Sequence, residues 1–88
     1  MIIILKFKSE SCPQCKALSI TLERISKENK IDIKNIDIEE DNNQDLIRKY
    51  NIRSIPTLIF LNEDQEYNRL VGNQSYATIN KIINYDTI

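Results

Sequence analysis

The apolar and polar positions along the chain follow two different periods, and each period predicts one kind of element. Residues 2–5 form a continuous apolar run that passes into alternation up to residue 8, as in a strand whose start is buried on both faces. Residues 13–29 place apolar side chains at helical spacing, with Pro13 in the favourable first helical position. The pattern therefore predicts a strand followed by a helix of about 15 residues.

The middle of the chain predicts a second strand and a short helix. Residues 33–38 are rich in Ile, but the alternation changes phase halfway, so we expect a bulge near Lys34 and Asn35. Residues 45–50 predict a short helix that follows an acidic run and ends in basic residues, as the helix dipole favours. Asn51 is a suitable left-handed residue to end this helix.

The last third of the chain predicts a hairpin and a final helix. Residues 57–61 and 66–71 predict two strands joined by a polar turn. Ser75 can cap a helix whose apolar face carries Tyr76, Ile79, Ile82 and Ile83. The order β-α-β-α-β-β-α predicts an α/β fold, and because 88 residues leave no room for a second core, we expect residues 1–88 to form a single domain.

Composition and charge narrow the classes of function. The chain is 41% hydrophobic and 28% charged, which is ordinary for a globular protein, and its net charge of −1 gives no electrostatic footprint for nucleic acid. No apolar run approaches the ~18–20 residues of a membrane span, and the N-terminal run is too short for a signal peptide. We therefore expect a cytoplasmic protein with neither a nucleic-acid nor a membrane partner.

Residue types that are absent or rare exclude several chemistries. The chain has no His, which excludes Cys-His catalysis and imidazole metal ligands, and its single Gly cannot form a glycine-rich phosphate loop. Two Cys cannot complete a four-thiolate zinc site within one chain. What remains are carboxylates, amines, phenols and the two thiols, Cys12 and Cys15, which are spaced C-x-x-C.

The predicted position of this pair suits thiol chemistry. Cys12 falls where the first strand leads into the first helix, and a helix N-terminus can lower a thiol pKa from ~8.5 into the range of ~3.5–7.5. Cys15 falls on the apolar face of the helix, so we expect it to be more buried and less acidic. That asymmetry fits dithiol exchange, in which one thiolate attacks a disulfide and the second resolves the mixed disulfide.

Other interpretations of the pair remain open at this point. A metal site would need two more ligands, from carboxylates or from a second subunit in a metal-bridged dimer. A purely structural disulfide would close a very short loop and gain little stability. The spacing could also arise by chance, and the protein could be a binding module without catalysis. The strand-to-helix position favours the redox interpretation.

Two segments resemble the thioredoxin/glutaredoxin superfamily, and together with the element order they extend the resemblance over essentially the whole chain. Residues 11–16, Ser-Cys-Pro-Gln-Cys-Lys, resemble its active-site motif, and residues 50–58 resemble the thioredoxin segment in which Ile-Pro-Thr carries a cis-proline. The resemblance implies a thioredoxin-like fold of glutaredoxin size, a four-stranded mixed sheet flanked by three helices. Pro56 would be the cis-proline; otherwise it would be an ordinary trans-proline that begins an edge strand.

The resemblance also implies roles for individual residues. Cys12 would be the nucleophile and Cys15 the resolving thiol. The groove for a disulfide-containing protein substrate would be formed by Pro13, Gln14, Arg53, Ile55, Pro56 and Thr57. No bound cofactor is expected, because the dithiol is itself the redox centre.

Departures from the family patterns bear on the thiol pKa and on the electron donor. Lys6 stands where thioredoxins bury an Asp beneath the second Cys; its cation would favour a thiolate or, alternatively, reach the surface. Lys8, Glu10 and Lys16 are further candidate modulators of the thiol pKa. The segment after Gly72 lacks the second Gly and the acidic residue of glutaredoxins, so the donor is either a thioredoxin-reductase-type flavoenzyme or glutathione. The expected protein is a monomeric thiol–disulfide oxidoreductase.

Overall fold

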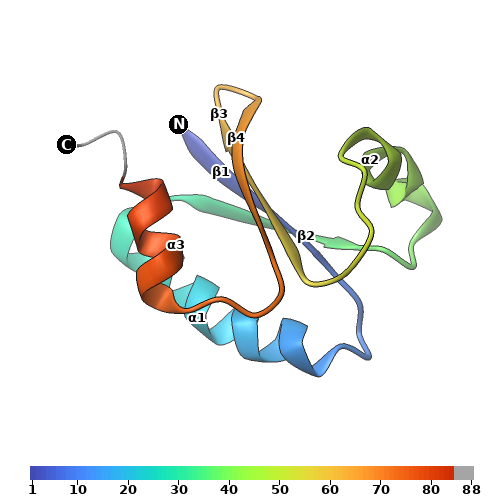
Figure 1. Cartoon of the computed structure of the whole chain (residues 1–88), viewed down its shortest axis with the longest axis horizontal. Coiled ribbons are helices and arrows are strands. Elements are labelled where there is room, and N and C mark those ends of the chain that lie inside the picture. Colours follow the sequence, from blue (N-terminus) through green and yellow to red (C-terminus); the bar gives the residue numbers. More distant parts are fainter. Residues whose placement is uncertain (85–88) are drawn as a thin grey trace.

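A mixed sheet with the strand order β2-β1-β3-β4 lies at the centre of the molecule (Figure 1). In the computed structural model, which describes residues 1–84, the elements are β1 (Ile2–Lys8), α1 (Pro13–Asn29), β2 (Asp32–Asp37), the 3-10 turn η1 (Asp41–Asn43), α2 (Gln44–Lys49), β3 (Thr57–Asn62), β4 (Gln65–Val71) and α3 (Tyr76–Ile83). β1 is parallel to β2 and antiparallel to β3, and β3 is antiparallel to β4. The predicted α/β fold and element order are confirmed.

Helices cover both faces of the sheet, because the central strands β1 and β3 are apolar on both sides. On one face, α1 and α3 pack their buried residues against the strands, in a cluster of Ile4, Leu18, Leu22, Ile25, Leu58, Phe60, Ile79 and Ile83. On the other face, residues of α2 pack around Leu5, Phe7, Ile36, Ile59 and Leu61. Figure 1 shows α2 on the opposite side of the sheet from α1 and α3.

The predicted bulge near Lys34 and Asn35 is wrong. The register between β1 and β2 runs without interruption from Ile3 opposite Asp32 to Lys8 opposite Asp37. The change of phase has another cause, because β2 contributes to both cores and its isoleucines are therefore divided between the two faces. The irregularity in the sheet lies instead between β3 and β4, next to Phe60.

Most predicted ends of elements are confirmed. Pro13 begins α1, Asn51 adopts a left-handed φ of 53° after α2, and Ser75 accepts a hydrogen bond from the amide of Thr78 as the cap of α3. The hairpin turn holds two residues with positive φ, Glu63 and Asp64. Helix and strand ends differ from the prediction by one residue in several places, and the short turn η1 was not anticipated.

The helices of this molecule are short and amphipathic. The longest, α1, has 17 residues and exposes charged side chains on the face opposite the core. Within residues 1–84, no helix has both the length and the apolar character needed to cross a membrane.

Candidate active site at the start of the first helix

Cys12 and Cys15 lie at the first turn of α1 and are joined by a disulfide, with their Cα atoms 5.2 Å apart. Cys12 is the N-cap of the helix: its backbone is extended, and its Sγ accepts a hydrogen bond of 3.0 Å from the amide of Cys15. Cys12 is half-buried, whereas Cys15 is only 2% exposed. The predicted difference in burial is therefore confirmed: Cys12 is partly exposed, and Cys15 is buried.

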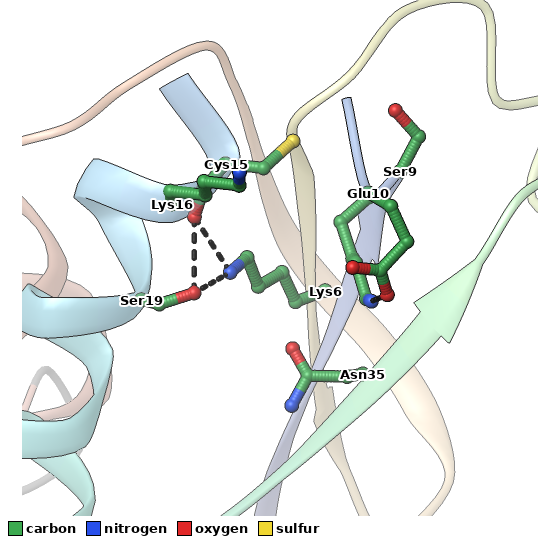
Figure 2. A pocket seen from close by; sticks show the side chains of 8 residues that line it. Lys6, Ser9, Glu10, Cys15, Lys16, Ser19 and Asn35 are labelled. Carbon is green, nitrogen blue, oxygen red and sulfur yellow. Dashed lines mark hydrogen bonds and ion pairs between the residues drawn. The ribbon is translucent and has the colours of Figure 1, made fainter. Parts of the chain in front are cut away.

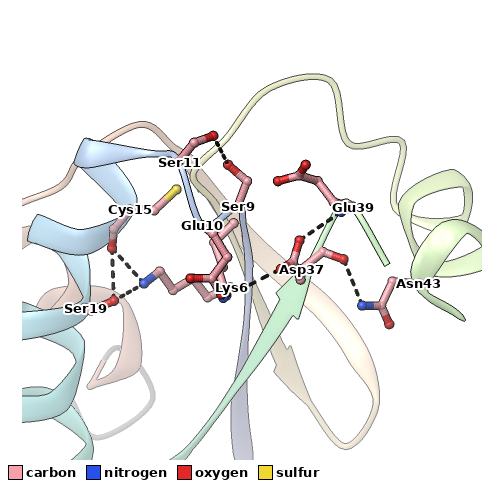
Figure 3. Close-up of polar contacts among 10 residues, drawn as sticks. Lys6, Ser9, Glu10, Ser11, Cys15, Ser19, Asp37, Glu39 and Asn43 are labelled. Carbon is pink, nitrogen blue, oxygen red and sulfur yellow. Dashed lines mark hydrogen bonds and ion pairs between the residues drawn. The ribbon is translucent and has the colours of Figure 1, made fainter. Parts of the chain in front are cut away.

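The connection from β1 into α1 determines this position. The strand ends at Lys8, and the amide of Cys12 then donates to the carbonyl of Ser9 across a tight turn, at 3.4 Å. The hydroxyls of Ser9 and Ser11 lie 3.4 Å apart within that turn (Figure 3). Pro13 occupies the first helical position and has no amide hydrogen. The remaining amides of the first turn point toward the helix end that carries Cys12, and the amide of Cys15 donates to Cys12 Sγ there.

The segment before β3 lies at the same end of the sheet. Phe7, near the end of β1, pairs with Thr57 at the start of β3, so the antiparallel register brings Pro56 beside the turn that carries the cysteines. The peptide bond between Ile55 and Pro56 is cis, as predicted. The Pro56 carbonyl accepts a hydrogen bond of 2.8 Å from the amide of Gly72, so β4 also supports this segment.

The side chains in and around the segment before β3 differ in how far they are exposed to solvent. Arg53 is exposed and Ile55 is half-buried, whereas Thr57 is 2% exposed and its hydroxyl donates to the Ser54 carbonyl at 2.6 Å. The Thr57 side chain therefore supports the segment from inside. A hollow of about 270 Å³ lies beside the segment before β3, and it is lined by Ile38, Ile47, Ile52, Arg53, Ser54 and Ile55. Pro13 and Gln14, on the helix side, are both exposed.

Lys6 lies beneath the pair and does not reach the surface, which settles the alternative that the sequence left open. Its side chain is 2% exposed, and Nζ donates hydrogen bonds to the Cys15 carbonyl at 2.8 Å and to the Ser19 hydroxyl (Figure 2). Ser19 in turn donates to the same carbonyl at 3.0 Å. Burial, together with the nearby charge of Lys8, lowers the pKa of the Lys6 ammonium.

The other cations of the site are less buried. Lys8 donates to Glu10 at 2.9 Å and lies 4.0 Å from Asp37, and the hydrogen bond from Lys8 to Glu10 raises the pKa of the Lys8 ammonium. Asp37 also accepts the amide of Glu39 at 2.9 Å (Figure 3). Lys16 is exposed. Glu10 is thus paired with Lys8, which offsets its negative charge near the thiols.

The candidate modulators of the thiol pKa gather around one cavity. It measures about 320 Å³ and is lined by Lys6, Lys8, Ser9, Glu10, Cys15, Lys16, Ser19 and Asn35. Sequence reasoning missed Ser19 and Asn35. Ser19 follows Cys15 by one helical turn and Asn35 pairs with Lys6 across the sheet, so helical spacing and strand register were the available signals. Among residues 1–84, no three side chains of the metal-ligating types lie together.

Comparisons with known proteins agree with this geometry. The family model described as Thioredoxin matches residues 1–85. Thioredoxin of Rickettsia bellii is 32% identical over 83 residues, which cover 93% of this chain and 79% of the relative. Thioredoxin of Bacillus subtilis is 28% identical over 83 residues, with 94% and 80% covered.

A solved structure shows the same fold. A mutant thioredoxin from Halobacterium salinarum superposes with a TM-score of 0.89 at 23% identity, and the match covers 99% of this chain and 75% of the other. The family match spans all of the described residues and includes both cysteines. This chain therefore belongs to the thioredoxin family, and it is a thiol–disulfide oxidoreductase whose redox centre is the Cys12–Cys15 disulfide.

Proposed function

We propose that the reduced protein cleaves disulfides in other proteins, with Cys12 as the nucleophile and Cys15 as the resolving thiol. The Cys12 thiolate attacks one sulfur of the substrate, forms a mixed disulfide and releases the first substrate thiolate, which takes a proton from water. The Cys15 thiolate then attacks Cys12 Sγ, which forms the Cys12–Cys15 disulfide and releases the second substrate thiolate. The observation that carries these roles is that Cys12 caps the helix and is half-buried, whereas Cys15 is buried.

The substrate would lie as an extended peptide between two exposed borders of the site. Pro13 and Gln14 form the border on the helix side. Ile55 offers backbone hydrogen bonds on the other border, with Pro56 and Thr57 supporting that segment from inside. The hollow beside Ile55 suits an apolar side chain of the substrate, because most of its lining residues are isoleucines.

Arg53 gives this border a preference for acidic substrates. Its side chain is exposed at the rim of the hollow, where it can meet a carboxylate of the bound peptide. Arg53→Gln should raise KM for a disulfide peptide with an acidic residue near its cysteine. KM for the matched peptide with Gln in place of that acid should stay unchanged. Equal effects on both peptides would contradict this preference.

For the electron donor we favour a thioredoxin-reductase-type flavoenzyme over glutathione. The curated relatives above are thioredoxins, and the segment after Gly72 lacks the glutaredoxin pattern. The C-P-Q-C motif, with Pro13 placed as in glutaredoxins, gives glutathione some support as the alternative donor. We also propose that residues 1–88 form a single domain that acts as a monomer in the cytoplasm.

Two cysteine variants test the roles. Cys12→Ser should lose disulfide reductase activity on a protein substrate, because Ser cannot form the mixed disulfide. Cys15→Ser should accumulate mixed disulfides, which non-reducing electrophoresis and mass spectrometry detect. Full activity in Cys12→Ser would overturn the proposal. Accumulation of mixed disulfides through Cys15 in Cys12→Ser, with none through Cys12 in Cys15→Ser, would reverse the two roles.

The donor is tested separately on the unmodified protein. Substrate reduction is followed with NADPH and a bacterial thioredoxin reductase in one reaction, and with glutathione and glutathione reductase in the other. Turnover should be faster with the flavoenzyme than with glutathione. Turnover with glutathione alone would place the protein functionally with the glutaredoxins.

A further inference from the structure

Within the described residues, Lys6 is a buried cation with no anionic partner. Its ammonium donates hydrogen bonds to two neutral oxygens there, the Cys15 carbonyl and the Ser19 hydroxyl. Among residues 1–84, no carboxylate oxygen lies within 4.0 Å of Lys6 Nζ, the distance at which the two groups would form an ion pair. A buried charge is normally paired, because losing its hydration is costly. An unpaired buried ammonium therefore points to an anion that forms during the reaction.

The group beside Lys6 that becomes an anion in the resolving step is the thiol of Cys15. Nζ lies 2.8 Å from the Cys15 carbonyl oxygen. Because the oxygen and Sγ of one cysteine are at most about 5 Å apart, the ammonium lies within about 8 Å of Cys15 Sγ. That is no more than the Debye length at physiological salt, and salt screens buried groups much less than exposed ones.

The other charged groups around Lys6 have partners of their own or are exposed. On β1, Lys8 is paired with Glu10 and with Asp37 of β2. On α1, Lys16 is exposed, and Glu23 is paired with Lys27 at 3.4 Å.

On β2, Asp32 is exposed and lines a second cavity beside Lys6 together with Glu23, while Asn35, opposite Lys6 in the sheet, is uncharged. Among these charged residues, Lys6 is the buried one.

We propose, on the basis of the function proposed above, that Lys6 is a positioning residue whose ammonium serves as the counter-ion of the Cys15 thiolate. In the resolving step the Cys15 proton passes to water in the adjoining cavity, and the electron pair left on sulfur forms the bond to Cys12 Sγ. The bond between Cys12 Sγ and the substrate sulfur breaks, and its electron pair leaves with the substrate thiolate. The ammonium has no lone pair and takes no proton. Lys6 therefore favours the thiolate by charge, where a buried carboxylate would act as a base.

The surroundings allow Lys6 to stay charged. Two cavities, of about 320 Å³ and about 450 Å³, share Lys6, Ser19 and Asn35 in their linings. Both volumes exceed the space of about 30 Å³ that one water occupies in the liquid. Since burial and the charge of Lys8 lower the pKa of Lys6, the assistance to Cys15 fades when Lys6 loses its proton at alkaline pH.

The test measures the pKa of Cys15 with no substrate present. In a Cys12→Ser background the only thiol is Cys15, and its ionisation is followed by thiolate absorbance at about 240 nm during a pH titration. The pKa of this thiol should lie at or below the ~8.5 of a free Cys, although the side chain is 2% exposed and burial alone would raise it. Adding Lys6→Met should raise this pKa by about one unit or more.

Two further variants separate charge from structure. Lys34→Met removes the same charge from an exposed position on β2 next to Asn35, and it should leave the pKa of Cys15 nearly unchanged. Ser19→Ala removes the second partner of Lys6 but keeps the ammonium, and it should also leave the pKa near its starting value.

A Cys15 pKa well above 8.5 before Lys6 is altered would overturn the proposal. So would equal shifts in Lys6→Met and Lys34→Met. A shift in Ser19→Ala as large as that in Lys6→Met would assign the effect to helix geometry and overturn it as well. Because the titration needs no reductase activity, its failure is distinguishable from failure of the proposed function.

Discussion

The amide of Cys15 donates a hydrogen bond of 3.0 Å to Sγ of Cys12, so the sulfur of one cysteine caps the helix that carries the other. A thiolate accepts such a bond more strongly than a thiol does, and the amides at a helix N-terminus favour negative charge. The carbonyl of Cys12 meanwhile accepts the amide of Lys16 at 3.2 Å, which keeps the backbone of Cys12 in the cap position. The same contact therefore bears on both reactivity and stability.

For reactivity, the cap predicts an acidic thiol at Cys12. In the reduced Cys15→Ser protein, the pKa of Cys12 should lie below ~8.5, within the range of ~3.5–7.5 typical of helix N-termini. The rate of alkylation by iodoacetamide as a function of pH measures it. A pKa at or above that of a free Cys would show that the helix end does not stabilise the thiolate.

For stability, the cap predicts that two substitutions of Cys12 differ. Ser offers an oxygen that can accept the Cys15 amide, whereas Ala offers nothing. Because neither variant forms the disulfide, their difference isolates the cap, and Cys12→Ser should be more stable than Cys12→Ala by about 1 kcal/mol. Urea unfolding of both proteins measures it, and equal midpoints would mean that the side-chain cap contributes nothing.

The sequence predicts the fold well, because the features that define it are local. Hydrophobic period, the proline at the start of α1, the left-handed Asn51 and the cap at Ser75 each act within a few residues. The change of phase in β2 has a cause that is not local, and the predicted bulge is therefore wrong. A bulge and a strand shared between two cores produce the same pattern, and only the positions of α1 and α2 distinguish them.

The site was predictable in part for the same reason. The cysteines and Pro56 stand in short motifs, whereas the position of Lys6 depends on three elements that meet in space. Its partner Ser19 lies on α1 and its neighbour Asn35 on β2. Whether a Lys at that position is buried or reaches solvent depends on how closely α1 packs on β1, which no local pattern records.

The burial of Lys6 predicts a substitution that strengthens the fold. In the oxidised protein, where Cys15 cannot ionise, Lys6→Met should raise the free energy of unfolding at pH 7 by about 1 kcal/mol or more, because it removes an unpaired buried charge. The Cys15 carbonyl keeps the hydroxyl of Ser19 as a donor at 3.0 Å, so it is not left unpaired.

The pH dependence of this difference follows from the lowered pKa of Lys6. Between its folded and unfolded pKa values the unfolded chain binds more protons, so the stability of the unmodified protein rises with pH there. The advantage of Met should therefore shrink as the pH approaches the unfolded pKa of ~10.4. Urea titrations at pH 7 and at alkaline pH check this, and a Met variant that is less stable at pH 7 would contradict the prediction.

A cluster far from the site predicts a different pH dependence. The Tyr76 hydroxyl of α3 donates to Glu28 of α1, and Arg24 pairs with the same carboxylate at 2.9 Å while its guanidinium lies 4.1 Å from the centre of the Tyr76 ring. The hydrogen bond from Tyr76, and then Arg24, lower the pKa of Glu28. The same hydrogen bond raises the pKa of Tyr76. Tyr76→Phe keeps the ring and removes this bond.

The two shifts give the stability of this cluster an acid and an alkaline limit. The contribution of Glu28 is present above its unfolded pKa of ~4.3 and is lost as the pH falls through the lower folded value. That of Tyr76 is present below ~10 and is lost as the pH rises through the higher folded value. Urea midpoints should therefore place Tyr76→Phe slightly below the unmodified protein near neutral pH, with the difference narrowing at both extremes.

Tyr50→Phe is the matched control, because the Tyr50 hydroxyl has no hydrogen-bond partner within residues 1–84. If the urea midpoints of both variants depended on pH in the same way, the assignment to Glu28 would be contradicted.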